Sequence, residues 1–103
     1  MIGRKPFRDL VARQLELFER EHADLLRACD EAERAYDRAP RDEAEERYAA
    51  YDDLVEDGTE ILAGLRDSYA ATLDEDTAAR YEDAFHRAVA RRYPRFAPAL
   101  PDT

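Results

Sequence analysis

The sequence predicts an all-α protein: a long antiparallel helical hairpin, similar to a coiled coil, followed by a shorter third helix. Three observations predict this class. Apolar residues recur at alternating intervals of four and three, the heptad spacing of paired helices. Only three glycines and five prolines occur, and the prolines fall where periodic segments begin or end. No segment shows the alternation that is typical of a strand.

The prolines and acidic clusters give the expected helix boundaries. Pro40 is expected to end the first helix, because proline disfavours a helical residue before it. Helices are therefore predicted over about 6–38, 42–73 and 75–93. Pro6 is expected in the first helical turn. Asp42 with Glu45 is predicted to cap the second helix. Asp74–Asp76 is expected to start the third helix, with acids in the first turn where the helix dipole favours them.

The last ten residues contain three prolines, Pro94, Pro98 and Pro101. Such a density favours an extended or disordered chain. The sequence therefore predicts one helical domain over 1–93 and an extended or disordered, proline-rich tail over 94–103.

Two apolar stripes define how the hairpin is expected to pack. The first is Val11, Leu15, Phe18, His22, Leu25, Cys29, Ala32 and Tyr36, and the second is Ala44, Tyr48, Tyr51, Val55, Gly58, Leu62, Leu65 and Tyr69. Folding the chain about Pro40 pairs every residue of one stripe with a residue of the other, in reverse order. Large then faces small, with His22 opposite Gly58 and Tyr36 opposite Ala44, as close packing requires.

The third helix is too short to cover the whole hairpin. At 1.5 Å per residue it spans about 28 Å, against roughly 50 Å for each long helix. The hairpin near Pro40 is therefore expected to be a bare two-helix tip carrying Tyr36, Tyr48 and Tyr51. An uncovered aromatic surface indicates association. The predicted partner is a second copy, most simply in a two-fold homodimer, or a helical or basic protein.

The formal charge of −9 is distributed unevenly. Residues 1–15 carry +3, residues 16–79 carry −14 and residues 80–103 carry +2. An acidic middle disfavours a nucleic-acid partner, because phosphates would be repelled. A basic partner surface, or the basic end of the third helix folding back, suits it better. That basic end comprises Arg87, Arg91, Arg92 and Arg95.

The chain is predicted to be cytoplasmic, with no membrane partner. No apolar run approaches the roughly 18–20 residues of a membrane helix, and no apolar stretch follows the basic N-terminal residues as in a signal peptide. Cys29 is the single cysteine, so no internal disulfide can form.

A metal site is the alternative to an interaction role. Both histidines follow a carboxylate by three residues, in the pairs Glu19–His22 and Asp83–His86. Residues three apart share a helix face, and the pairs resemble the Glu-x-x-His elements of ferritin-like di-iron carboxylate proteins. That resemblance implies iron handling, with Fe, Mn or Zn as the metal. Since acids are abundant here, such pairs also arise by chance, and His22 is explained as a side chain that fills the space opposite Gly58.

No catalytic or cofactor-binding residue is predicted. The acidic run Asp52, Asp53, Glu56, Asp57 and Glu60 resembles the paired acids that hold Mg²⁺ in all-α nucleotide pyrophosphatases, but it lies off the apolar stripe and is interpreted as a solvated face. Ser68, the only serine, has no base paired with it. The sequence therefore predicts a non-enzymatic helical interaction or scaffold protein that self-associates, with the metal-binding helical bundle as the alternative.

Overall fold

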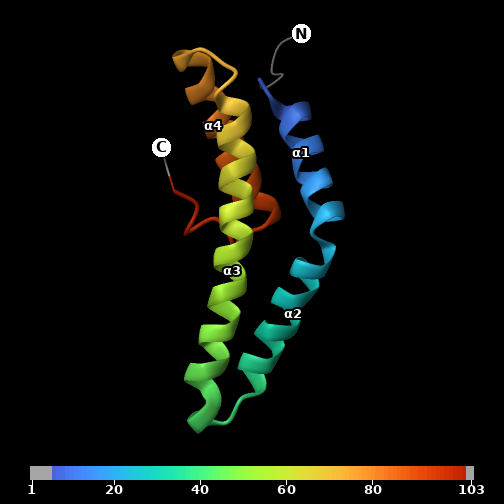
Figure 1. Ribbon diagram of the computed structural model, residues 1–103, viewed down its shortest axis with the longest axis vertical. Helices are drawn as coiled ribbons and strands as arrows, with labels where there is room; N and C mark the ends of the chain where they lie inside the picture. Colours follow the sequence, from blue (N-terminus) through green and yellow to red (C-terminus); the bar gives the residue numbers. More distant parts are fainter. Residues whose placement is uncertain (1–5, 102–103) are drawn as a thin grey trace.

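A computed structural model describes residues 6–101, which form an elongated helical molecule of 54 × 24 × 23 Å (Figure 1). Its four helices are α1 (Arg8–Glu21), α2 (Ala23–Arg38), α3 (Arg41–Ala70) and α4 (Glu75–Arg92). No strand occurs among these described residues, so the predicted all-α class is confirmed. The number of helices is not as predicted, because the expected first helix is divided into α1 and α2.

The division falls at His22, whose backbone leaves helical geometry with φ −124° and ψ 32°. Hydrogen bonding continues on both sides of the break. The His22 amide donates to the Phe18 carbonyl at 2.9 Å, and the Leu26 amide donates to the His22 carbonyl at 3.1 Å. Helix kinks usually come from proline, glycine or an inserted group, and neither proline nor glycine lies near His22 in the sequence. We therefore attribute the break to tertiary packing.

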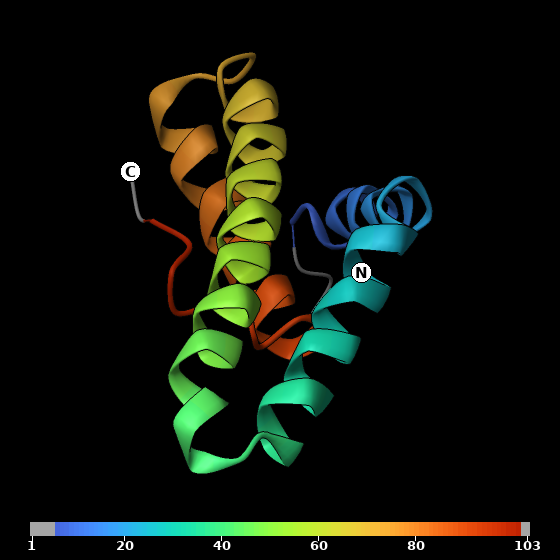
Figure 2. The same ribbon diagram turned by 60° about the horizontal axis from the view of Figure 1, so that its bottom comes forward.

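The break allows α1 to lean away from α3, and α4 occupies the space that opens. In Figures 1 and 2, α2 and α3 run antiparallel side by side, whereas α1 diverges from α3. α4 packs against both α1 and α3. The register predicted between the start of the chain and the end of α3 is therefore wrong: α1 packs on α4, not along α3.

The segment after α4 is folded, contrary to the predicted extended or disordered tail. Residues 94–99 form successive turns, in which the Phe96 amide donates to the Tyr93 carbonyl at 3.0 Å, and the Leu100 amide that follows donates to the Ala97 carbonyl at 3.2 Å. Phe96 is 0% exposed and Leu100 is 8% exposed. Burial of these two apolar side chains offsets the tendency of the prolines to keep the segment extended. Residues 1–5 and 102–103 lie outside the described part of the chain.

Gly58 explains where the tail fits. A Cβ atom at this position would lie 2.4 Å from Cε1 and 2.7 Å from Cζ of Phe96, well inside van der Waals contact. Glycine therefore lets the Phe96 ring rest directly on the backbone of α3. The predicted packing reason for Gly58 exists, but its partner is Phe96, not His22. The Phe18 ring completes this junction, with its centroid 5.5 Å from that of Tyr93 and 6.2 Å from that of Phe96.

The core lies in the half of the molecule that contains α1, α4 and the second half of α3. Its most buried apolar side chains are Val11, Leu15, Phe18, Leu62, Tyr81, Phe85, Val89 and Phe96. Phe7, the residue before α1, has a left-handed backbone (φ 67°), and its ring packs edge-on against Tyr81 at 5.5 Å. Ring burial of this kind offsets the strain of a positive φ at a bulky residue.

The helix starts show which capping predictions hold. α4 starts at Glu75 with Glu75 and Asp76 in its first turn, as predicted, and Asp74 in addition caps it by accepting a hydrogen bond from the Thr77 amide at 2.9 Å. α3 begins earlier than predicted, at Arg41, with Pro40 in the cap position and no side-chain cap from Asp42 or Glu45. Pro40 has φ −66°, which already suits the entry to a helix. Pro6 likewise lies outside α1.

Candidate functional site

The two-helix tip carries an aromatic cluster formed by the three predicted interface residues. Tyr36 on α2 and Tyr48 on α3 pack edge to face, with ring centroids 5.4 Å apart, and Tyr48 lies 6.3 Å from Tyr51. Tyr36 is 39% exposed and Tyr48 is 50% exposed. The structure therefore brings the three tyrosines together and leaves two of them open to solvent.

Arg95 joins the tip to the C-terminal segment. Its guanidinium lies 2.8 Å from a carboxylate oxygen of Glu33 and 3.0 Å from one of Asp30, and 5.7 Å from the ring centroid of Tyr51. The pKa of the Tyr51 hydroxyl is raised, because burial disfavours the phenolate more than the nearby Arg95 favours it. Tyr51 is thus the fixed inner member of the cluster, whereas Tyr36 and Tyr48 form its outer surface.

The basic end of α4 does contact the acidic middle of the chain, as predicted. Arg92 pairs with Glu19 of α1 at 2.9 Å, in addition to the contacts of Arg95 with α2. Arg87 and Arg91 instead line a surface groove together with residues at the start of α1. The four arginines therefore form two groups: Arg92 and Arg95 bridge to α1 and α2, whereas Arg87 and Arg91 line the groove.

The four residues of the metal-binding alternative are held in separate pairs. Glu19 binds Arg92, and Asp83 binds Arg87 at 2.5 Å. His22 packs against the Phe18 ring, 5.4 Å away, and lies beside a shallow hollow lined also by Asp57 and Glu60. Among residues 6–101, no group of three or more histidine, cysteine or acidic side chains is close enough to share a metal ion. The alternative based on these residues therefore finds no support in the geometry.

His86 has a different partner, which the sequence analysis missed. Its Nε2 lies 2.7 Å from a guanidinium nitrogen of Arg66. Arginine has no acceptor, so in this hydrogen bond Nε2 of His86 is the accepting atom. The lone pair that would bind a metal is therefore engaged with Arg66.

Arg66 is a buried charge at 1% exposure. Its Nε donates to a carboxylate oxygen of Asp67 at 2.8 Å, and its guanidinium also donates to the carbonyl of Pro101. The residue therefore ties α3 to α4 and to the end of the C-terminal segment. A signal existed in the sequence, since Arg66 is the only basic residue between Arg47 and Arg80.

The remaining reactive side chains lie in packing positions. Cys29 is 0% exposed, and burial raises the pKa of its thiol although Arg95 is near. A buried thiol with a raised pKa is poorly reactive, since the thiolate is the nucleophile. The acidic run from Asp52 to Glu60 is exposed at each of its carboxylates, in agreement with a solvated face.

A second surface feature was also missed by the sequence analysis: a groove between the start of α1 and the outer side of α4, here called the arginine groove. It has a volume of about 630 Å³, and its rim carries Arg8, Arg80, Arg87 and Arg91. Three of these arginines recur along α4 at helical spacing, which is the sequence signal that could have found the groove.

The floor of the arginine groove is formed by small apolar side chains, Val11, Ala84 and Ala88. Within residues 6–101, Asp83 is the only acidic residue that lines the groove, and it is paired with Arg87. The groove is therefore a cationic surface with an apolar floor, on a chain whose formal charge is −9.

Comparison with known proteins adds no assignment: the chain matches no protein-family model, no curated protein and no solved structure. None of the described helices is long and apolar enough to cross a membrane.

Proposed function

We propose that this chain is a non-enzymatic helical interaction or scaffold protein that self-associates through its two-helix tip. The observation that carries the proposal is the exposed tyrosine pair, Tyr36 and Tyr48, on a part of the molecule that no third helix covers. Of the three large apolar or aromatic side chains exposed among residues 6–101, two are these tyrosines.

The chemistry of the tip suits association. Tyrosine is favoured at protein interfaces, because its ring can be buried while its hydroxyl finds a partner or stays in water. The edge-to-face contact between Tyr36 and Tyr48 restricts both rings before any partner arrives, which reduces the entropic cost of binding. A homodimer is the proposed state, with coiled-coil-like pairing of helices at the tip.

Charge favours a basic counterpart for the tip. Residues 30–57 contain twelve acidic and four basic side chains. Two tips placed against each other would repel, whereas a basic surface on the second copy would attract the tip. A helical or basic protein of another kind is the alternative occupant.

Sedimentation velocity on the purified chain tests the proposal. At about 100 µM, a concentration that populates micromolar complexes, the parent is expected as a dimer. The double variant Y36S/Y48S is expected to sediment as the 11.9 kDa monomer. Leu17→Ser is the matched control, since Leu17 is 43% exposed but lies on α1, outside the tip. A monomeric parent, or a Y36S/Y48S variant that associates as the parent does, would contradict the proposal.

A further inference from the structure

The arginine groove is unusual because its positive charge is only partly neutralised. Arg87 pairs with Asp83 at 2.5 Å, whereas Arg80 donates a hydrogen bond to the hydroxyl of Thr77 at 3.4 Å and forms no ion pair within residues 6–101. Arg8 and Arg91 are exposed and form no ion pair with any residue in 6–101. A groove with unpaired guanidinium groups above an apolar floor suits an acidic helix, which would supply carboxylates at the rim and small side chains at the floor.

The α4 side of this groove is a stripe of four residues, separated in the sequence by four, three and four positions. Its members are Arg80, Ala84, Arg87 and Arg91. Positions with this spacing lie on one face of a helix. The pattern is three arginines with an alanine in second place.

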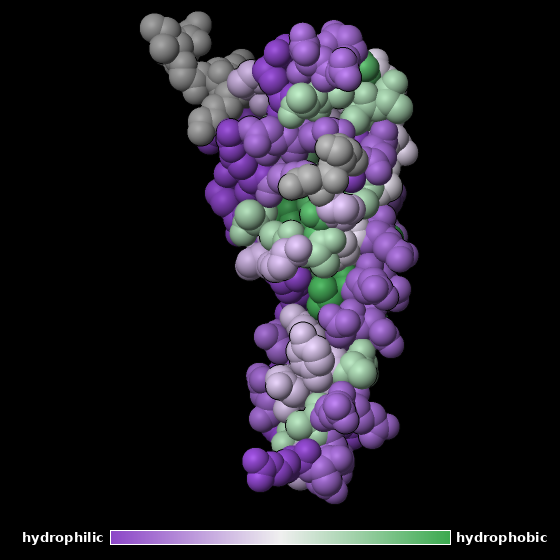
Figure 3. Space-filling model, turned by 90° about the vertical axis from the view of Figure 1, so that its left-hand side faces the viewer, coloured by the Kyte–Doolittle hydropathy of each residue, from purple (hydrophilic) through white to green (hydrophobic). Residues whose placement is uncertain are grey.

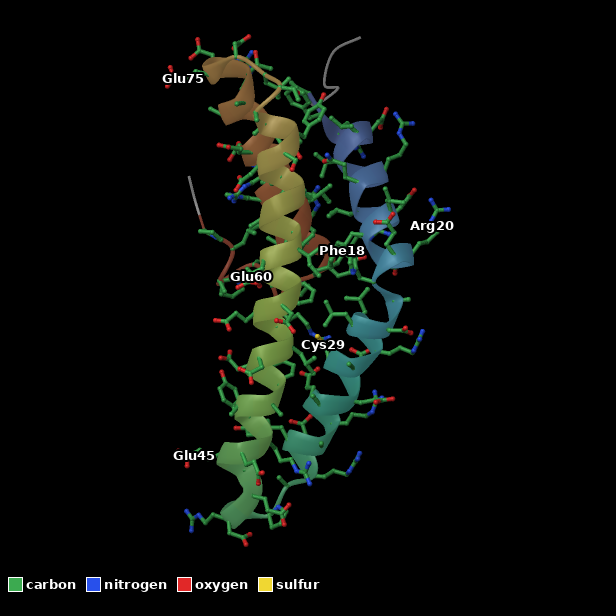
Figure 4. All side chains as sticks on the ribbon, viewed as in Figure 1. Phe18, Arg20, Cys29, Glu45, Glu60 and Glu75 are labelled. Atoms are coloured by element: carbon green, nitrogen blue, oxygen red, sulfur yellow. The ribbon has the colours of Figure 1, made fainter. Side chains whose placement is uncertain are left out.

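The N-terminal half of α3 carries a stripe of the same spacing and opposite charge. Its members are Glu45, Ala49, Asp52 and Glu56, again with alanine in second place. All four are exposed, and none of the three acids forms an ion pair within the described chain. Figure 4 shows Glu45 pointing outwards from α3, away from α2. Figure 3 shows that the lower part of this side of the molecule is mostly hydrophilic.

We infer that the arginine groove of one copy receives the acidic stripe of α3 from a second copy. The inference rests on the proposed self-association and names the surface that the tip meets. The matched spacing allows a carboxylate to face a guanidinium at each charged position of the stripe. The alanines of both stripes, with Ala88, allow the helix axes to approach to about 8–10 Å, the ordinary range for packed helices.

The same docking accounts for the exposed tyrosine. Tyr48 lies three residues after Glu45 and four before Asp52, so its ring borders the acidic stripe. In the complex this ring lies beside the arginines of the groove. A guanidinium group is attracted to the face of an aromatic ring, so this contact favours association. The tyrosine pair thus forms the apolar edge of the docked surface.

The two surfaces lie at opposite ends of the molecule, whose longest dimension is 54 Å (Figure 1). The acidic stripe is near the α2–α3 turn, and the groove is near the start of α1. Two copies placed antiparallel can therefore each receive the other's acidic stripe in their arginine groove. This reciprocal contact closes with two copies, as the proposed homodimer requires.

Charge reversal tests the inference with two variants of the full chain. R80E/R87E/R91E removes the basic groove and keeps the acidic stripe, whereas E45R/D52R/E56R removes the stripe and keeps the groove. Alone, each variant is expected to self-associate at least about tenfold more weakly than the parent, since attraction at the contact becomes repulsion. Mixed, they are expected to form a 1:1 complex, because the native groove of one variant meets the native stripe of the other and the reversed groove meets the reversed stripe.

Two controls separate a specific contact from a general charge effect. R13E/R20E/R27E and E16R/E21R/E75R make the same changes in net charge at exposed positions outside both stripes, and both are expected to associate as the parent does. Circular dichroism confirms that all four variants are folded. Folded groove and stripe variants that remain monomeric when mixed would overturn the inference, as would a groove variant that associates as strongly as the parent.

The outcome also separates this inference from the proposed function. If Y36S/Y48S is monomeric while the groove variant associates like the parent, the tip is an interface but its counterpart is not the groove. If the parent is monomeric up to about 1 mM, a concentration at which even weak specific contacts form, both the proposed function and this inference are wrong.

Discussion

The two halves of the molecule share one helical pattern but reach different degrees of burial. In the bundle half, where α1, α4 and the C-terminal segment surround the second half of α3, Leu15, Leu62, Tyr81 and Phe85 are each no more than 1% exposed. In the tip half, no residue between 30 and 54 is buried, although the apolar stripe continues there. A stripe on two helices is shielded only when a third element covers it. The difference shows that apolar periodicity determines which face of a helix turns inward, whereas burial of that face requires another segment to cover it.

The largest expected effect comes from removing the side chain that closes the bundle half. Phe96→Ala is expected to lower the free energy of unfolding by about 3–5 kcal/mol, because it removes a fully buried ring and leaves a cavity against Gly58 and Phe18. Urea denaturation measures this change. A loss below about 1 kcal/mol, the size typical of surface changes, would show that the C-terminal segment is not part of the core.

High pH is expected to destabilise the bundle half next. Burial raises the pKa of the Tyr81 hydroxyl from 10.0 to about 12. In the folded state the phenol keeps its proton to higher pH than in the unfolded state. The stability that this protonated hydroxyl contributes is therefore complete below pH 10 and is lost as pH rises to 12. The free energy of unfolding is expected to fall by roughly 2–3 kcal/mol over this range.

Tyr81→Phe is the control for that pH profile. The variant loses the 2.9 Å hydrogen bond from the tyrosine hydroxyl to Gln14, so it is less stable near neutral pH. Its stability should nevertheless decline less steeply between pH 10 and 12. An unchanged slope would assign the decline to other groups.

Substituting two glycines of α3 tests the difference between the covered side and the open side of one helix. Gly58→Ala is expected to destabilise by about 1–3 kcal/mol, because the new Cβ overlaps the Phe96 ring. Gly64→Ala is expected to stabilise by about 0.5–1 kcal/mol, since no atom lies within 4 Å and alanine favours the helix. Thermal or urea melts of both variants measure the pair. The same sign for both would mean that Phe96 does not rest on α3.

The smallest effect on stability is expected at the tip. Below the concentration for association, Tyr48→Ala is expected to change the free energy of unfolding by less than about 1 kcal/mol, as its ring is half exposed. At associating concentrations the same variant is expected to melt at a lower temperature than the parent, because it loses the stabilisation that a bound partner gives. A melting difference independent of concentration would make Tyr48 part of the monomer's core and not an interface residue.

Much of this fold could be predicted from local rules. Heptad spacing, the position of Pro40 and the acids at 74–76 identify the class, the α2–α3 turn and the start of α4, because each depends on residues close in sequence. The same rules placed Tyr36, Tyr48 and Tyr51 on one surface at the tip, since they follow from the pairing of neighbouring helices about one turn.

The predictions that failed all depended on contacts between distant residues. A proline-rich sequence disfavours helix, but it does not exclude a folded segment when Phe96 and Leu100 find a core to enter. The break at His22 has no local cause in the sequence. It lies beside the contact of Phe18 with Phe96, which comes more than seventy residues further along the chain. Proximity of Glu19 to His22 along the helix suggested a ligand pair, whereas in three dimensions Arg92 takes the carboxylate.

The sequence by itself thus determined the helical class, the turn at Pro40, the distribution of charge and the presence of a closely packed site at Gly58. Periodicity, proline geometry and composition are local properties of the chain. Only the tertiary structure decided the partner of Gly58, the burial of Arg66 and the formation of the arginine groove. The physical reason is that these features require side chains from segments far apart in the chain to meet. Which segments meet depends on the competition among all of them for the same apolar surface.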